Sequence, residues 1–237
     1  MMPILSIVVI YILAAIVPAI FLMRYVYRKD TVEKEPRGLL GALVLCGVGA
    51  ALVSIVLESI GTGILDRFLD EGSPVYSIVL AFLVVAVVEE GAKYVFLRFA
   101  TWKNPNFNYR FDAVVYAVFV SLGFAAFENI GYVFGYGLSV SIPRAVLAIP
   151  AHMGFAVFMG IFYGRAKLCS RQGRKAACTA NLIVGYIIAV FLHGFYDACA
   201  MVGTGLAITL FVVFVVIMYI VTIRVLKKQS ASDHPIY

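Results

Sequence analysis

Long apolar stretches separated by short polar segments repeat along the whole chain. Each stretch has about 20 residues, the length that an α-helix needs to cross the hydrocarbon core of a bilayer. The pattern therefore predicts an all-α membrane protein, a polytopic bundle of about seven transmembrane helices. The predicted spans cover residues 3–23, 39–62, 75–97, 112–137, 143–164, 179–201 and 204–223.

Composition agrees with this interpretation. Of the 237 residues, 63% are hydrophobic and only 14% are charged, whereas soluble domains carry about 45–50% apolar and about 25% charged residues. We find no repeat or low-complexity segment, so we expect one transmembrane domain over residues 1–237, with its polar motifs within about 75–201. The longest loops are predicted near 24–37 and 165–178. The four cysteines form no CxxC pair and are expected to be reduced thiols.

Basic residues indicate the orientation. Of the 19 Lys and Arg residues, 16 follow the first, third, fifth and seventh predicted spans. Basic loops remain in the cytoplasm, so the pattern predicts an odd number of spans, with the N-terminus outside and the C-terminus in the cytoplasm. The first span has no basic segment before it and is expected to be retained as a helix. The net charge of +6 is explained by these loops, so we expect a lipid bilayer as partner and no nucleic acid.

Ionisable groups inside the predicted spans carry the chemistry. Each costs about 2.5–3.5 kcal/mol at a helix centre and is usually functional. Those placed well within the spans are Glu89, Glu90, Lys93, Glu128, His152, His193 and Asp197. They fall on four spans, and one shared hydrated cavity explains their combined cost better than separate structural ion pairs. Glu58 lies near the outer end of its span and is expected at the membrane interface. The last span has no ionisable group and is expected to be a packing helix.

Spacing adds detail to this picture. Glu89 and Lys93 are four residues apart and share a helix face, as do His193 and Asp197. An aspartate in this position can fix the tautomer of its histidine and leave the other ring nitrogen free. Pro150 is expected to kink the helix beside His152. The pairs Gly131–Gly135 and Gly160–Gly164 predict close helix–helix contacts.

The motifs together resemble those of a known family. "EEGAK" fits E-E-x-x-K, "FAAFE" fits F-x-x-x-E through Phe124 and Glu128, and "HGFYD" fits H-x-x-x-D, with His152 between the last two. In this order the set resembles the PrsW family of bacterial intramembrane proteases, over about residues 30–200. The resemblance implies a bacterial plasma-membrane enzyme. Its implied activity is site-1 cleavage of a single-span anti-sigma factor, which releases a stress-response sigma factor after further proteolysis.

The related CAAX prenyl endopeptidases use E-E-x-x-x-R, F-x-x-x-H and H-x-x-x-N. Here the lysine is one residue closer, and Glu128 and Asp197 replace the histidine and the asparagine. These differences favour a PrsW-like substrate over a prenyl-protein substrate.

Two routes to peptide hydrolysis are open. The motifs hold no serine or cysteine beside a suitable base, which disfavours a covalent route. In the first route, Glu89 or Glu90 is a general base that activates water, and a histidine polarises the substrate carbonyl. Lys93 keeps one of the glutamates ionised and oriented. The second route adds a divalent metal such as zinc, held by a set of three candidate ligands. That set is Glu128, His152 and His193, with Asp197 as the partner of His193.

Two other classes of protein remain possible from the residues alone. A transporter or proton-coupled carrier also places carboxylates and histidines in a membrane cavity, and a scaffold or binding protein would need none of them for catalysis. Depth is a difficulty for the protease. At about 1.5 Å per residue, His152 lies about 13 Å below the outer end of its predicted span, and Glu89 lies about 20 Å below the outer end of its own. The two residues are therefore not expected at the same depth.

Overall fold

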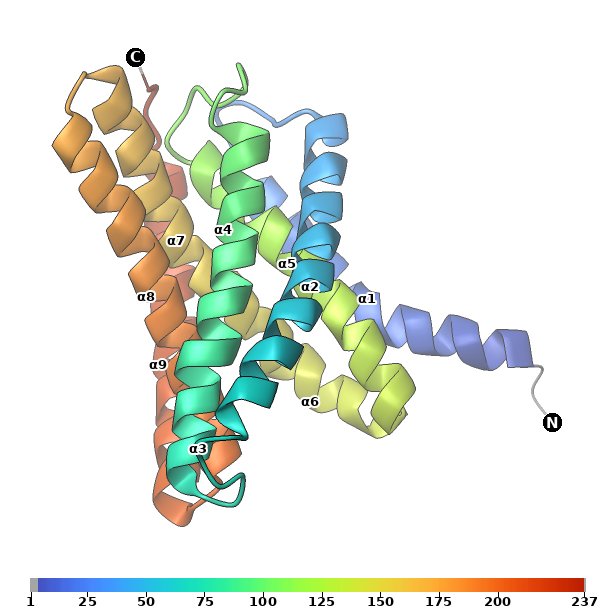
Figure 1. Ribbon diagram of the computed structural model, residues 1–237. Helices are drawn as coiled ribbons and strands as arrows, with labels where there is room; N and C mark the ends of the chain where they lie inside the picture. The colour runs from blue at the N-terminus through green and yellow to red at the C-terminus, as the bar shows by residue number, and fades with distance from the viewer. Residues whose placement is uncertain (1–3, 237) are drawn as a thin grey trace.

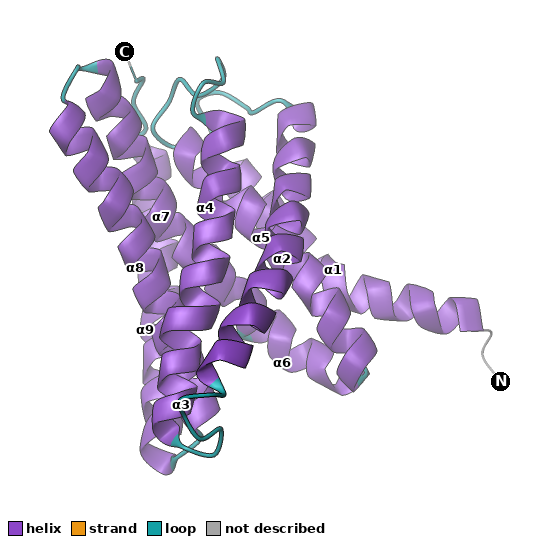
Figure 2. Cartoon of the chain, in the orientation of Figure 1, coloured by secondary structure: helices purple, strands orange, loops and turns teal. Residues whose placement is uncertain are grey.

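A computed structural model describes residues 4–236, and most of them are helical (Figures 1 and 2). The helices in chain order are α1 (Ile4–Lys29), α2 (Arg37–Leu65), α3 (Pro74–Val79), η1 (Leu80–Ala86), α4 (Val87–Thr101), α5 (Asp112–Tyr136), η2 (Leu138–Val140), α6 (Ser141–Val146), α7 (Ala148–Arg171), α8 (Lys175–Val202) and α9 (Gly205–Ala231). η1 is a π-helix and η2 is a 3₁₀-helix.

Seven helical segments are long and apolar enough to cross a membrane, which confirms the predicted number among the described residues. α3, η1 and α4 form the third segment, and η2, α6 and α7 form the fifth. The helices extend further than predicted, so the connections at 30–36 and 172–174 are shorter than the loops expected at 24–37 and 165–178. Both lie, with 102–111 and the C-terminus, at what we call the basic end of the bundle (top in Figure 1).

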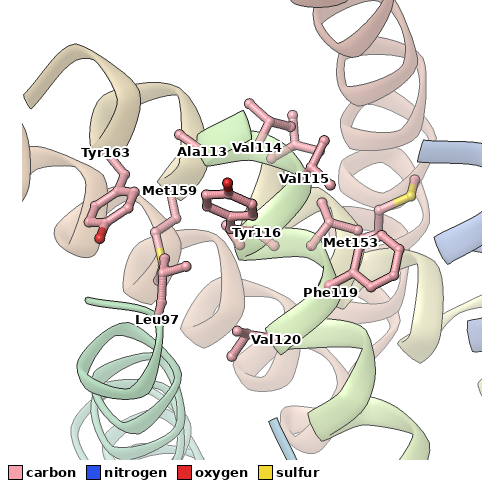
Figure 3. Close-up of a cluster of buried hydrophobic side chains, with 14 of the residues drawn as sticks. Leu97, Ala113, Val114, Val115, Tyr116, Phe119, Val120, Met153, Met159 and Tyr163 are labelled. Atoms are coloured by element: carbon pink, nitrogen blue, oxygen red, sulfur yellow. The ribbon is translucent and has the colours of Figure 1, made fainter. Parts of the chain in front are cut away.

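Helix α5 is the centre of the bundle. Its residues from Asp112 to Ala126 are all buried. In the most apolar stretch of α5, 83% of the residues are buried by the rest of the bundle, whereas in that of α1 only 11% are. A helix that is apolar on every side needs neighbours on every side, and α5 packs against α1, α2, α4 and α7. Figure 3 shows part of this core, where Leu97 of α4 and Met159 of α7 lie on one side of Tyr116.

Glycine allows α7 to approach α5 closely. A Cβ atom on Gly160 would lie 2.7 Å from the Cα atom of Val114. One on Gly164 would lie 2.8 Å from the backbone oxygen of Arg110, just before α5 begins. The helix contact predicted for this pair is therefore confirmed. The same prediction is wrong for Gly131 and Gly135, because a Cβ atom on either would meet nothing within 4 Å.

This contrast predicts opposite signs for one chemical change. Gly160→Ala should lower the free energy of unfolding by about 1–3 kcal/mol, because overpacking forces two backbones apart. Gly135→Ala should be neutral or stabilising by up to about 1 kcal/mol, because alanine is the better helix former. Thermal unfolding in detergent measures both. Equal stability of the two variants would contradict the close approach of α5 and α7.

The C-terminal residues fold back onto the basic end. The Arg110 amide donates to the carbonyl of His234, and the Ile236 amide donates to that of Asn108. Asp233 Oδ1 accepts a hydrogen bond from the Phe111 amide at 2.9 Å, at the start of α5. The tail therefore ties the end of α9 to the loop between α4 and α5.

Two buried acids of the loop between α1 and α2, at the same end of the bundle, predict a pH dependence for this tail. Burial raises the pKa of Asp30 to about 6 and that of Glu35 to about 7, from ordinary values of about 4. A raised carboxyl pKa stabilises the folded state below the ordinary value, and this contribution is lost as the pH rises through 6 to 7. Ionised Asp30 then repels Asp233.

We therefore expect the backbone amides of Asp233, His234 and Ile236 to exchange hydrogen faster at pH 8 than at pH 5, after correction for the intrinsic rates. The variants Asp30→Asn and Glu35→Gln should flatten this dependence, whereas His234→Gln should keep it. If the pH dependence disappears only in His234→Gln, it is due to the histidine, and its attribution to Asp30 and Glu35 is wrong.

Candidate active site

The glutamate pair lies in the first turn of α4, directly after the π-helix η1. Lys93 Nζ donates to Glu89 Oε2 at 2.9 Å and to Glu90 Oε1 at 2.8 Å, and all three side chains are buried. π-helical turns are often found at functional sites. Here Tyr186 of α8 also donates to the carbonyl of Val87, at the junction of η1 and α4.

His152 enters from α7, close to the point where this span is broken. Helix α6 ends at Val146 and α7 begins at Ala148, so the interruption lies just before Pro150. Proline has no N–H to bond to the carbonyl four residues earlier, and here that carbonyl belongs to Val146. The Tyr219 hydroxyl of α9 lies 2.8 Å from this oxygen and donates to it. Helix α9, expected only to pack, thus supports the broken helix.

The His152 ring bridges two groups of opposite charge. Its Nδ1 lies 3.2 Å from Lys93 Nζ, and its Nε2 lies 3.2 Å from Glu128 Oε2 of α5. Its backbone carbonyl accepts a hydrogen bond from the Ser121 hydroxyl. The α5 carboxylate therefore sets the orientation of the ring.

His193 of α8 has a matching arrangement. Its Nδ1 lies 2.9 Å from Glu90 Oε1, and its Nε2 lies 3.1 Å from Asp197 Oδ2. The rings of His152 and His193 are 5.2 Å apart at their centroids. Each histidine thus directs Nδ1 towards the glutamate–lysine group of α4 and gives Nε2 to a second carboxylate. This is the pattern in which an outer carboxylate fixes the tautomer of a ligand.

Four side chains converge closely enough to hold one ion. Glu89, Glu90, His152 and His193 each offer a ligand atom, and these atoms all lie within 4.8 Å of one another. The depth difficulty from the sequence therefore does not arise. A π-helix has more residues per turn and advances less per residue than an α-helix, and the fifth span is interrupted, so a uniform rise does not apply to either. Glu128 is outside this four-residue group.

The chemistry of the group fits a divalent metal. Two imidazole nitrogens and two carboxylates are a suitable donor set for zinc. The Lys93 ammonium already lies among three of the donors, so the position attracts a cation. Glu90 Oε2 is buried and has no hydrogen-bond partner among the described residues. The residues present therefore fit such an ion.

Two cavities meet at this group. The inner cavity, of about 410 Å³, lies towards α6, α7 and α8. The side cavity, of about 290 Å³, lies between α2 and α5. The inner cavity is lined by residues that include Glu128, Arg144, His152, His193 and Asp197. Glu89 lines both cavities, whereas Glu90 lines neither and is fully buried. The two adjacent glutamates therefore differ in their access to water.

Sequence reasoning missed three residues of the site. Glu58, expected at the interface, lines both cavities, and its buried Oε1 has no hydrogen-bond partner among the described residues. Arg144 forms a 2.9 Å ion pair with Glu128 and stacks on Tyr132. Its basic side chain close to a span was a signal that could have identified it. Tyr132, which also lines both cavities, gave no comparable signal.

The fold and this group define a class: a polytopic helical membrane protein with a buried, water-accessible glutamate–histidine centre suited to metal-assisted hydrolysis. The sequence profile described as "PrsW family intramembrane metalloprotease" matches residues 35–223. The chain belongs to this family and is an intramembrane protease.

Curated relatives agree over most of the chain. "Protease PrsW" of Clostridioides difficile (strain 630) is 34% identical over 232 residues, which are 95% of this chain and 93% of the relative. "Protease PrsW" of Shouchella clausii (strain KSM-K16) is 32% identical, over 92% of this chain and 96% of the relative. That of Bacillus subtilis (strain 168) is 30% identical, over 78% and 79%. No solved structure matches the chain. These relatives favour the protease over the transporter or the scaffold.

Proposed function

We propose that the chain is a metal-dependent intramembrane endopeptidase that cuts single-span anti-sigma factors at site 1. The observation that carries this proposal is the convergence of two carboxylates and two imidazoles, from three helices, within 4.8 Å. We place the enzyme in the bacterial plasma membrane, with the basic end in the cytoplasm, because Lys and Arg gather on cytoplasmic loops.

The residue roles follow from the contacts. We assign His152, His193 and Glu90 to hold the ion, since Glu90 Oε1 lies 2.9 Å from His193 Nδ1 and shares with His152 Nδ1 a contact to the Lys93 ammonium. Glu128 and Asp197 accept from the opposite ring nitrogens and keep each Nδ1 unprotonated and oriented. In this assignment Glu128 is an orienting partner, whereas the sequence suggested it as a ligand. A bound divalent metal would polarise the substrate carbonyl and favour ionisation of water.

Glu89 is the general base in this scheme because it is the glutamate that reaches both cavities. Its carboxylate takes one proton from a cavity water, and the water oxygen bonds to the peptide carbonyl carbon. When the C–N bond breaks, the same proton passes to the leaving nitrogen, so that water is divided between a new carboxylic acid, which keeps the other proton, and a new amine. Lys93 orients Glu89 from four residues along the helix.

A reconstitution experiment tests the proposal. The purified chain is mixed in liposomes with single-span anti-sigma factors from the genome that encodes it, and the fragments are identified by mass spectrometry. We expect one cut in or beside the membrane segment that a chelator prevents and added zinc restores. Cleavage that is unaffected by complete metal removal would contradict the metal, and no cleavage of any such factor would contradict the substrate class.

A further inference from the structure

The side cavity has no role in the chemistry described above, although it reaches the catalytic group. It shares Glu58, Glu89, Glu128 and Tyr132 with the inner cavity, and its remaining lining comes from α2 and α5. A side chain or peptide in the side cavity would therefore lie next to the proposed base. The remaining lining of the inner cavity, by contrast, comes from η1 and from α6 to α9.

The side cavity opens on the outer surface of the bundle. Ile55 of α2 and Tyr136 of α5 line it and are 57% and 70% exposed. Gly131 of α5 also lines the cavity, and a Cβ atom there would meet nothing within 4 Å. At Gly131, α5 is thus uncovered by any other helix among the described residues, and it forms one wall of an opening that faces the bilayer.

Two unused hydrogen-bond acceptors lie along the opposite wall. Ser54 is 1% exposed, and its Oγ has no hydrogen-bond partner among the described residues, like Glu58 Oε1 on the same face of α2. Four residues of helix separate them by about 6 Å. An extended peptide presents N–H groups to one side every second residue, about 7 Å apart. The two acceptors therefore match the donors of a strand.

We propose that the side cavity is the entry site for the substrate's membrane segment, which binds there as an extended strand between α2 and α5. This assignment rests on the proposed proteolytic function. Backbone N–H groups exposed by unwinding have no water to bond in a bilayer, and Ser54 and Glu58 replace that water. Gly131 leaves this wall without a side chain, so the backbone of a bound strand can approach α5 there.

A matched pair of substitutions tests the entry site. Gly131→Leu fills the cavity, whereas Gly135→Leu, one turn away on the same exposed face, does not line it. We expect the first to slow cleavage of a reconstituted single-span anti-sigma factor by about 10-fold or more through lost positioning. The second should retain the wild-type rate, and both should keep the wild-type unfolding temperature and metal content. Equal rates for the two variants would overturn the entry site, whereas a wild-type chain that cuts nothing would overturn the proteolytic function instead.

A binding measurement decides the same question without cleavage. A photo-crosslinking amino acid is placed at Ile55 or at its neighbour Val56, which are 57% and 58% exposed but differ in that only Ile55 lines the cavity. The probe is a synthetic single-span peptide with a Gly/Ala/Ser-rich centre, added to the Glu89→Gln variant in liposomes. We expect several-fold more crosslinking from position 55, and a loss of this excess when Gly131→Leu is added. Equal yields at the two positions would refute the proposal.

Discussion

Glu89→Gln is expected to reduce cleavage of a reconstituted single-span substrate by about 10²–10⁴-fold, the usual contribution of a positioned general base. The amide keeps the size of the side chain but cannot accept the proton of water. Lys93 retains its 2.8 Å contact with Glu90, so the buried ammonium is not left unpaired. The initial rate of product formation, measured with saturating zinc, gives the effect directly.

Two comparisons show whether this loss is chemical. Glu71→Gln changes an exposed acid in the loop between α2 and α3 and should leave the rate unchanged. Bound metal in Glu89→Gln should remain near one ion per chain, because the other three donors are intact. If Glu89→Gln cleaves within a few-fold of the wild type, the base is another group and the assignment from cavity access is wrong.

His193→Ala is expected to remove both bound metal and cleavage. The substitution deletes the Nδ1 that faces Glu90 and leaves two buried carboxylates with one imidazole. Asp197→Asn keeps the ring but weakens the group that fixes its tautomer, and we expect a loss of about 10–100-fold in metal affinity. Zinc titration with a competing chelator measures both affinities on purified protein.

The order of the two effects is the informative result. Excess zinc should recover much of the cleavage in Asp197→Asn and none in His193→Ala. Glu128→Gln should behave like Asp197→Asn, since it holds the other histidine through Nε2. If Glu128→Gln instead loses metal as completely as His193→Ala, Glu128 belongs to the ligand set after all.

The sequence predicts the spans and the polar residues of the site well, because both depend on local rules. Twenty apolar residues suffice to define a span, and a buried charge such as Glu90 or Lys93 is too costly to occur there by chance. Helical spacing also pairs His193 with Asp197 correctly, since residues four apart always share a face.

The remaining features depend on contacts between helices, which spacing along one helix does not determine. Nothing in "FAAFE" shows that Glu128 meets Nε2 of His152 while Lys93 meets Nδ1. A π-turn in η1 and the break at Leu147 change the relative depth of α4 and α7, and no local pattern marks the first. The sequence places Glu58 near the end of its span, which predicts the membrane interface. The side cavity between α2 and α5, which Glu58 lines, forms only when the helices assemble.

The most direct test of the glutamate–histidine centre is to measure bound zinc and cleavage in the same samples as metal-free protein is titrated with zinc. The account predicts that the rate rises in proportion to bound zinc and levels off at about one ion per chain, as expected for one catalytic site. The same titration of His193→Ala should show neither tight binding nor cleavage. Full cleavage by metal-free protein, or equal zinc binding by His193→Ala, would contradict it.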